Sequence, residues 1–122
     1  MMGQTGVLEK TLKCTAAVTT AYVFAKFGAD DDTYDVTSSA TDKSIGIIQH
    51  TTDAAGDETR LMLLGISRLK LGGTVTRGAE LTSDANAKGV AATAGQSTMA
   101  IALASGVSGD IIPVYVRPVN AI

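Results

Sequence analysis

His50 is the only histidine of the chain, and its imidazole could take part in catalysis. A serine-type triad needs a serine, a histidine base and a carboxylic acid brought together. His50 follows an expected strand and precedes Thr51-Thr52-Asp53, and the sequence contains no Gly-x-Ser-x-Gly elbow to present a nucleophilic serine. We therefore interpret His50 as an ordinary strand-end residue and expect a chain that is not an enzyme and has no catalytic residues.

The carboxylates of Asp30-Asp31-Asp32 and Asp35 could offer oxygen ligands to a hard cation such as calcium. Their spacing does not match the calcium-loop pattern Asp-x-Asp-x-Asp-Gly, and consecutive carboxylates in a turn point in different directions. A solvated turn is the favoured interpretation, and a metal site is the alternative. The glycines at Gly72-Gly73 and at 106–109 lack the lysine and the helix of a phosphate-binding loop. We expect neither a metal nor a cofactor.

Cys14 is the only cysteine, which excludes an internal disulfide and a cysteine-based zinc site. A thiol becomes reactive when a positive charge lowers its pKa, and Lys13 is adjacent. The favoured interpretation is a small apolar residue, with a reactive thiol as the alternative.

Arginines flank the longest apolar segment of the chain, at Arg60, Arg68 and Arg77. The simpler interpretation is that they solvate the ends of a strand. The alternative is partner recognition, because the planar guanidinium suits carboxylates on a facing subunit. We retain all three as candidate partner-binding residues.

Length and composition limit the class of protein. The chain of 122 residues has room for one domain, and its aromatic content of 4% provides few bulky side chains, so contacts with neighbouring subunits could supply missing burial. Its ten basic and twelve acidic residues are dispersed, which argues against nucleic acid as a partner. No apolar run is long enough to span a membrane. Residues 1–13 lack the features of a signal peptide, so we expect synthesis and use in a cytoplasm.

Abundant Thr, Gly, Ala and Val with few prolines favour strands joined by tight turns, and we expect a mainly β fold, either a small β-barrel or a β-sandwich. The expected strands cover residues 21–27, 33–36, 45–49, 58–71, 79–82, 89–92, 98–103 and 111–117. An alanine-rich helix over 84–94 is the alternative for that stretch, and Gly89 disfavours it.

The strand over 58–71 is apolar on both faces in its middle, with leucines on one face and Met62, Leu64 and Ile66 on the other. This pattern predicts a central position in the sheet, with a bulge or bend at Gly65. Residues 40–63 and 92–116 also share a similar spacing of Ser, Gly-Asp and apolar positions. Either both halves use one hairpin plan, or the two hairpins are alike by composition alone.

Residues 1–20 carry small and polar side chains with too little bulk for a core face, so we expect an N-terminal arm attached to a single β domain over 21–122. Such an arm could add a strand to a neighbour's sheet edge. Pro113 places the strand over 111–117 at an edge or bulge, where Tyr115 is a candidate contact. The candidate partner-binding residues of the arm are Thr11, Leu12, Lys13, Thr15 and Val18.

Six segments of turn glycines and apolar strands follow one another from about residue 40 to 118. They are Ser44-Ile45-Gly46-Ile47-Ile48, Leu63-Leu64-Gly65-Ile66, the run from Gly72 to Asp84, Lys88-Gly89-Val90-Ala91-Ala92, Ala100-Ile101-Ala102-Leu103 and Gly109-Asp110-Ile111-Ile112-Pro113-Val114. In their order and spacing the chain resembles the head decoration, or capsid cement, proteins of tailed bacteriophages. Residues 1–39 lie outside this resemblance.

The resemblance implies a structural virion protein that decorates the outer capsid surface, as a homotrimer, and clamps neighbouring major capsid subunits. Its partners would be the major capsid protein and further copies of itself, with no nucleic acid and no membrane, and assembly would take place in the cytoplasm of the host bacterium. Two alternatives stay open. One is another virion component, such as a tail or spike protein, and the other is a small β-barrel that binds a ligand.

Overall fold

The computed structural model describes the backbone of residues 5–121 and the side chains of residues 8–116, and over this range it contains strands and no helix. The strands are β1 (Thr5–Cys14), β2 (Phe24–Phe27), β3 (Thr33–Val36), β4 (Ser44–Ile48), β5 (Glu58–Lys70), β6 (Glu80–Ser83), β7 (Gly89–Ala91), β8 (Ser97–Ala102) and β9 (Ile111–Ala121). The prediction of a mainly β fold is confirmed. In the described range no helix could cross a membrane.

Five strands close on themselves in the order β1-β3-β2-β4-β5, and we call this unit the first barrel. The circuit closes because β1 pairs antiparallel with β5, from Thr5 opposite Ile66 to Lys13 opposite Glu58, and parallel with β3. Tyr34 and Leu61 are fully buried members of its core. The prediction of a small β-barrel is thereby confirmed.

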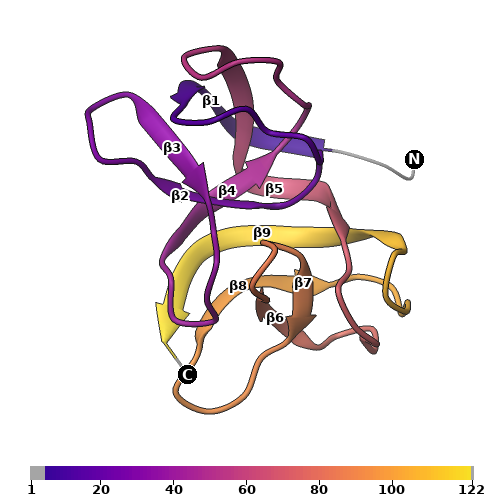
Figure 1. The fold of residues 1–122 in the computed structure, drawn as a ribbon. Coiled ribbons are helices and arrows are strands. Elements are labelled where there is room, and N and C mark those ends of the chain that lie inside the picture. The colour runs from indigo at the N-terminus through magenta and orange to yellow at the C-terminus, as the bar shows by residue number, and fades with distance from the viewer. Residues whose placement is uncertain (1–4, 122) are drawn as a thin grey trace.

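The other strands extend from β5 in the order β5-β9-β8-β6-β7, and we call this unit, with residues 65–71, the second barrel. An isolated parallel bridge between Leu71 and Gly89 brings β7 back to the end of β5. The two barrels lie one above the other in Figure 1, and β5 runs from the first into the second. The predicted central position of the 58–71 segment is confirmed, because β5 pairs with β1, β4 and β9.

Gly65 lies where β5 passes from β1 to β9. Its φ is 132°, and the β1 strand opposite shifts register between Gly6 and Leu8. A side chain is strained at this φ, so glycine suits the junction. The predicted irregularity at Gly65 is therefore present.

The two barrels repeat one strand plan. The hairpin β2–β3 corresponds to β6–β7, the hairpin β4–β5 corresponds to β8–β9, and each circuit ends in a parallel contact. The shared spacing of residues 40–63 and 92–116 thus reflects one hairpin plan. A composition effect alone would not reproduce the pairing order.

Individual backbone hydrogen bonds repeat as well. In the first barrel Cys14 donates to the Asp57 carbonyl at 3.0 Å and accepts from Gly56 at 2.8 Å. In the second barrel Leu71 donates to the Asp110 carbonyl and accepts from Gly109, both at 2.8 Å. Gly56 and Gly109 have φ values of 90° and 92°. The correspondence therefore holds residue by residue, with Cys14 equivalent to Leu71.

The expectation that residues 1–20 have too little bulk for a core face is wrong for the described part of that segment. Leu12, Cys14 and Val18 are buried at 4%, 2% and 5% exposure. The sequence pattern did not predict this burial, because a narrow barrel needs few inward side chains from each strand. Residues 1–4 lie outside the described residues.

The start of β2 differs from expectation. The strand expected over 21–27 begins only at Phe24, because Tyr22 adopts a left-handed φ of 62°. The alternative helix over 84–94 is absent. The Asp84 carboxylate accepts the backbone N–H groups of Asn86 and Lys88 and holds a turn that leads into β7.

Candidate functional site

His50 is exposed, and both of its ring nitrogens lie near backbone groups. Nδ1 is 3.1 Å from the Thr51 carbonyl oxygen, and the Arg60 backbone N–H donates to Nε2 at 3.4 Å. A neutral ring with its proton on Nδ1 satisfies both contacts. These backbone contacts hold the ring beside β5. Among residues 8–116 they do not form a catalytic dyad.

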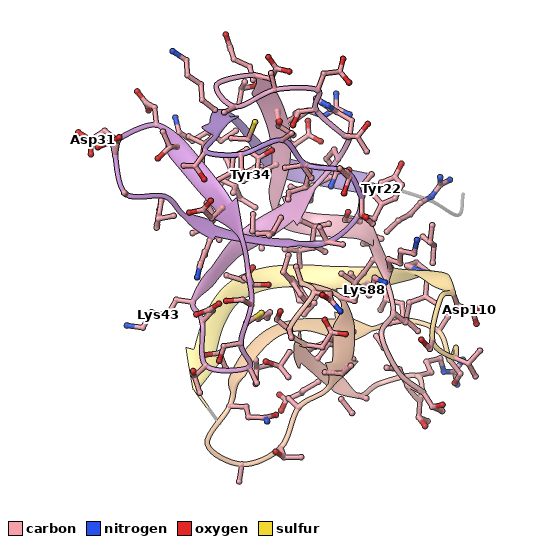
Figure 2. All side chains as sticks on the ribbon, viewed as in Figure 1. Tyr22, Asp31, Tyr34, Lys43, Lys88 and Asp110 are labelled. Atoms are coloured by element: carbon pink, nitrogen blue, oxygen red, sulfur yellow. The ribbon has the colours of Figure 1, made fainter. Side chains whose placement is uncertain are left out.

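The carboxylates of the β2–β3 turn are solvated. Asp30, Asp31 and Asp32 are exposed, and Figure 2 shows Asp31 at the tip of the turn, pointing away from the molecule. Asp35 accepts a hydrogen bond from the Thr15 hydroxyl. In the part of the chain that the structure describes, no group of three His, Cys, Asp or Glu residues could hold a metal ion.

The Cys14 thiol is buried in the first barrel. Its sulfur lies 3.3 Å from the Thr52 hydroxyl and donates to the Ala54 carbonyl at 3.3 Å. The thiol therefore packs in the core and ties β1 to the turn before β5, which agrees with its interpretation as a small buried residue.

The five candidate residues of the N-terminal segment divide into two groups. Thr11, Lys13 and Thr15 are exposed, whereas Leu12 and Val18 are buried in the first-barrel core. Along β1 the alternation of Thr11, Leu12 and Lys13 follows from the strand period, which turns successive side chains to opposite faces. Leu12 and Val18 thus have a packing role, and partner contact by the exposed three stays a prediction.

The candidate arginines are spread over both barrels. Arg60 lies on the first barrel, where its Nε is 3.6 Å from a Glu9 carboxylate oxygen. Arg68 and Arg77 are exposed on the second barrel, and Tyr115 is 40% exposed there. The structure does not bring these four side chains to one site, and their binding of a partner stays a prediction.

An apolar hollow of about 410 Å³ opens at one end of the first barrel, and we call it the mouth. It is lined by Leu8, Lys10, Leu12, Phe27, Ser44, Ile45, Leu63 and Leu64. Phe27 is 72% exposed and Leu8 53% exposed, which is unusual for large apolar side chains. A rim of this kind marks a place where another molecule can bind.

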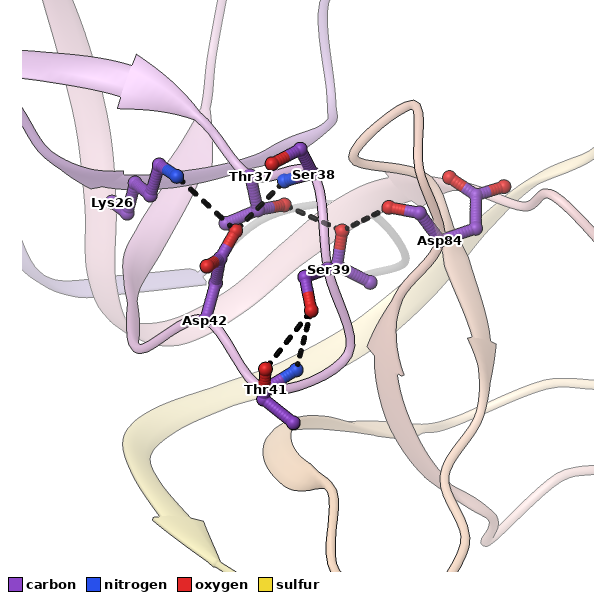
Figure 3. A network of polar contacts seen from close by, with 8 residues as sticks. Lys26, Thr37, Ser38, Ser39, Thr41, Asp42 and Asp84 are labelled. Atoms are coloured by element: carbon purple, nitrogen blue, oxygen red, sulfur yellow. Dashed lines mark hydrogen bonds and ion pairs between the residues drawn. The ribbon is translucent and has the colours of Figure 1, made fainter.

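The side of the first barrel that faces the second carries a polar network, shown in Figure 3. The hydroxyls of Thr37 and Ser83 are 2.6 Å apart, and Ser83 donates to the Asp84 carbonyl. In the same network the Asp42 carboxylate accepts from the Ser38 backbone N–H at 2.8 Å and lies 3.3 Å from the Lys26 ammonium. The loop over 37–43 therefore joins the two barrels through satisfied polar groups.

Among known proteins, the similarity of this chain lies in its fold. No family model matches the chain, and no curated protein matches it. The fold is similar to the crystal structure of the head fiber gp8.5 N base in bacteriophage phi29, with a TM-score of 0.67. The similarity covers 89% of this chain and 92% of that one at 16% sequence identity. At this identity the likeness establishes a shared fold.

Sequence reasoning did not single out Leu8, Phe27, Ile45 or Leu63 as surface residues. Phe27, Ile45 and Leu63 stand in apolar strand patterns that are equally typical of a core, and Leu8 lies in the segment expected to be an arm. A residue-by-residue comparison of the two halves is the signal that could have found them, because Phe27 stands where the second half has Ser83.

Proposed function

We propose that this chain is a structural protein of a bacteriophage head that binds the outside of the capsid and stabilises it by clamping neighbouring major capsid subunits. The observation that carries the proposal is the fold, which is shared over 89% of the chain with the N base of a phage head fiber. The resemblance of residues 40–118 to head decoration proteins supports the same class. Fold alone does not determine function, so the surface chemistry must agree with it.

The polar surface of the described residues fits a binding role better than a catalytic one. His50 contacts backbone groups, and the acidic turn at 30–32 is solvated. The mouth has an apolar lining and offers no pair of acid and base. These features support a protein that acts through contact, and we propose that it is not an enzyme.

We propose the major capsid protein and further copies of this chain, as a homotrimer, as its partners. One oligomer that holds several capsid sites binds tightly even when each contact is weak, because the later contacts form at high effective concentration. Exposed Thr11 and Lys13 on β1 and the guanidinium of Arg60 beside them are the contacts we favour.

The experiment that tests this function separates the heads and tails of virions of the source phage and then adds the full-length chain to heads that lack it. We expect recovery of the chain with heads, saturable rebinding, and electron cryo-microscopy density on the outer surface where capsid subunits meet. Rebound heads should also resist heat better than bare heads.

Recovery with tails would favour the tail or spike alternative and reject the proposal. Recovery in neither fraction would reject any role in the virion. The contact residues are tested separately with Thr11→Glu and Lys13→Glu, because removal of β1 would take away a strand of the first barrel.

A further inference from the structure

The mouth of the first barrel has a counterpart in the second barrel, and that counterpart is covered. Strand pairing makes Lys10 equivalent to Ser67, Phe27 to Ser83 and Leu63 to Val116. Ser67 is 0% exposed, and Ser83 and Val116 are each 1% exposed. The same structural position is thus solvent-accessible in one barrel and buried in the other.

The first barrel supplies the cover. Gln49 donates through Nε2 to the Ser67 hydroxyl at 3.0 Å, and the Thr37 and Ser83 hydroxyls form the 2.6 Å contact. Apolar side chains join them, because Phe24, Ile47 and Met62 belong to the same core cluster as the second-barrel residues. The chain therefore contains one complete contact between the outer side of one barrel and the mouth of the next.

The second barrel carries the equivalents of these covering residues on its own outer side, which we call the base. Repeated pairing makes Ala92 equivalent to Thr37, Ile101 to Ile47 and Tyr115 to Met62, and places Leu103 at the position of Gln49. Leu103 and Tyr115 are each 40% exposed. The base thus presents apolar side chains to solvent at positions that, in the first barrel, cover a mouth.

The mouth and the base each differ in polarity from their equivalents in the contact inside the chain. Inside the chain the cover and the mouth pack through apolar side chains and also form polar contacts, including Thr37 on Ser83. At the free ends an alanine stands in place of Thr37, and a phenylalanine in place of Ser83. Two apolar surfaces that repeat the geometry of an existing contact are suited to each other.

We infer that the mouth of one copy binds the base of a second copy, head to tail, in the same arrangement that joins the two barrels within one chain. This contact is heterologous, so it uses two different surfaces of each copy and closes into a ring when the rotation permits. The inference rests on the self-association in the proposed function and names the surfaces that produce it.

The test uses the full chain and one charged variant for each surface. Phe27→Glu changes the mouth and Tyr115→Glu changes the base, both at exposed positions, and Ile111→Glu is the control at an apolar residue that is 50% exposed and outside both surfaces. Sedimentation of each protein gives its mass. We expect the unchanged chain and Ile111→Glu to associate, and Phe27→Glu and Tyr115→Glu each to need roughly tenfold more protein, or higher, for the same association.

A mixture of the two variants provides the decisive measurement. Phe27→Glu keeps an intact base and Tyr115→Glu keeps an intact mouth, so an equimolar mixture should form a complex of one copy of each at concentrations where each variant alone is a 12.4 kDa monomer. A contact between identical surfaces would not be restored by mixing. A monomeric unchanged chain, an unrestored mixture or an equal loss in Ile111→Glu would overturn the inference.

The same proteins separate this inference from the proposed function. A chain that associates head to tail and ignores phage heads would leave the inference intact and reject the function. Heads that bind monomeric chain, with Phe27→Glu binding as well as the unchanged protein, would support the capsid-binding role and reject both the homotrimer and the inference.

Discussion

Tyr22 and Gly78 occupy equivalent left-handed positions in the two barrels. Tyr22 has a φ of 62° and donates to the Ile48 carbonyl, and Gly78 has a φ of 90° and donates to the Ala102 carbonyl, each at 2.8 Å. Only glycine adopts this conformation without steric cost. The second barrel therefore uses the unstrained residue at a position where the first tolerates a tyrosine.

Gly78→Ala should lower the free energy of unfolding by about 1 kcal/mol, because a Cβ at this φ strains the backbone while meeting no atom within 4 Å. Urea denaturation checks the value. The matched control is Gly73→Ala, whose φ lies outside the left-handed range and whose Cβ would make an ordinary 3.5 Å contact with Val90. Equal losses in both variants would contradict the strain argument.

Tyr34 is fully buried and donates to the Thr59 hydroxyl at 2.7 Å. Tyr34→Phe leaves Thr59 without this donor and should destabilise the fold by about 1 kcal/mol. Burial raises the pKa of Tyr34 above its ordinary value of 10.0, although the bond to Thr59 opposes the shift.

The raised pKa of Tyr34 determines how the stability of the fold changes at alkaline pH. The unfolded tyrosine loses its proton at a lower pH than the folded one, so the stability that Tyr34 contributes is present below pH 10.0 and is lost as the pH rises through the folded pKa. Urea titrations at rising pH should show this loss in the unchanged chain and a smaller loss in Tyr34→Phe. Tyr115→Phe, at an exposed position, should keep the loss of the unchanged chain.

At the scale of elements, the loop over 37–43 holds the two barrels together. The backbone hydrogen bond from Ser38 lowers the pKa of the Asp42 carboxyl below its ordinary value, and Lys26 lowers it further. The unfolded carboxyl therefore binds a proton at higher pH than the folded one. Its contribution is present above the unfolded pKa and is lost as the pH falls through the folded pKa.

Asp42→Asn should lower the unfolding free energy by about 1 kcal/mol near neutral pH, because the amide accepts more weakly and forms no ion pair with Lys26. The difference from the unchanged chain should shrink once the pH is well below the ordinary carboxyl pKa. Asp31→Asn, in the solvated turn, is the control and should change little. A difference that persists unchanged in acid would show that the charge is not the cause.

At the scale of the whole molecule, the barrels share β5 and one core cluster that includes Phe24, Ile47 and Met62 from the first barrel. A continuous core couples the two units energetically. We therefore expect a single cooperative unfolding transition, in which the calorimetric and van't Hoff enthalpies agree. Two separate transitions in calorimetry would contradict this coupling.

Much of the fold follows from local sequence. Glycine-rich turns separate β-branched runs, and the expected strand over 33–36 has the bounds of β3. Tyr115 and the arginines, expected as surface contacts, are exposed, although the strand of Tyr115 lies between β5 and β8 and not at a sheet edge. The same reasoning missed β1, because Leu12 and Cys14 among threonines and lysines do not reveal that β5 has an open edge for them.

The sequence by itself determined the extended segments, the turns between them and the absence of recognised catalytic and phosphate-binding motifs, because those depend on side-chain type and on neighbours in the chain. Only the tertiary structure decided which barrel end is covered. The polarity of a side chain limits the environments that it tolerates. Whether the side chain is buried depends on which segment, from far along the chain, packs over it. Ser83 is therefore buried, and Phe27, at the equivalent position of the repeat, is exposed.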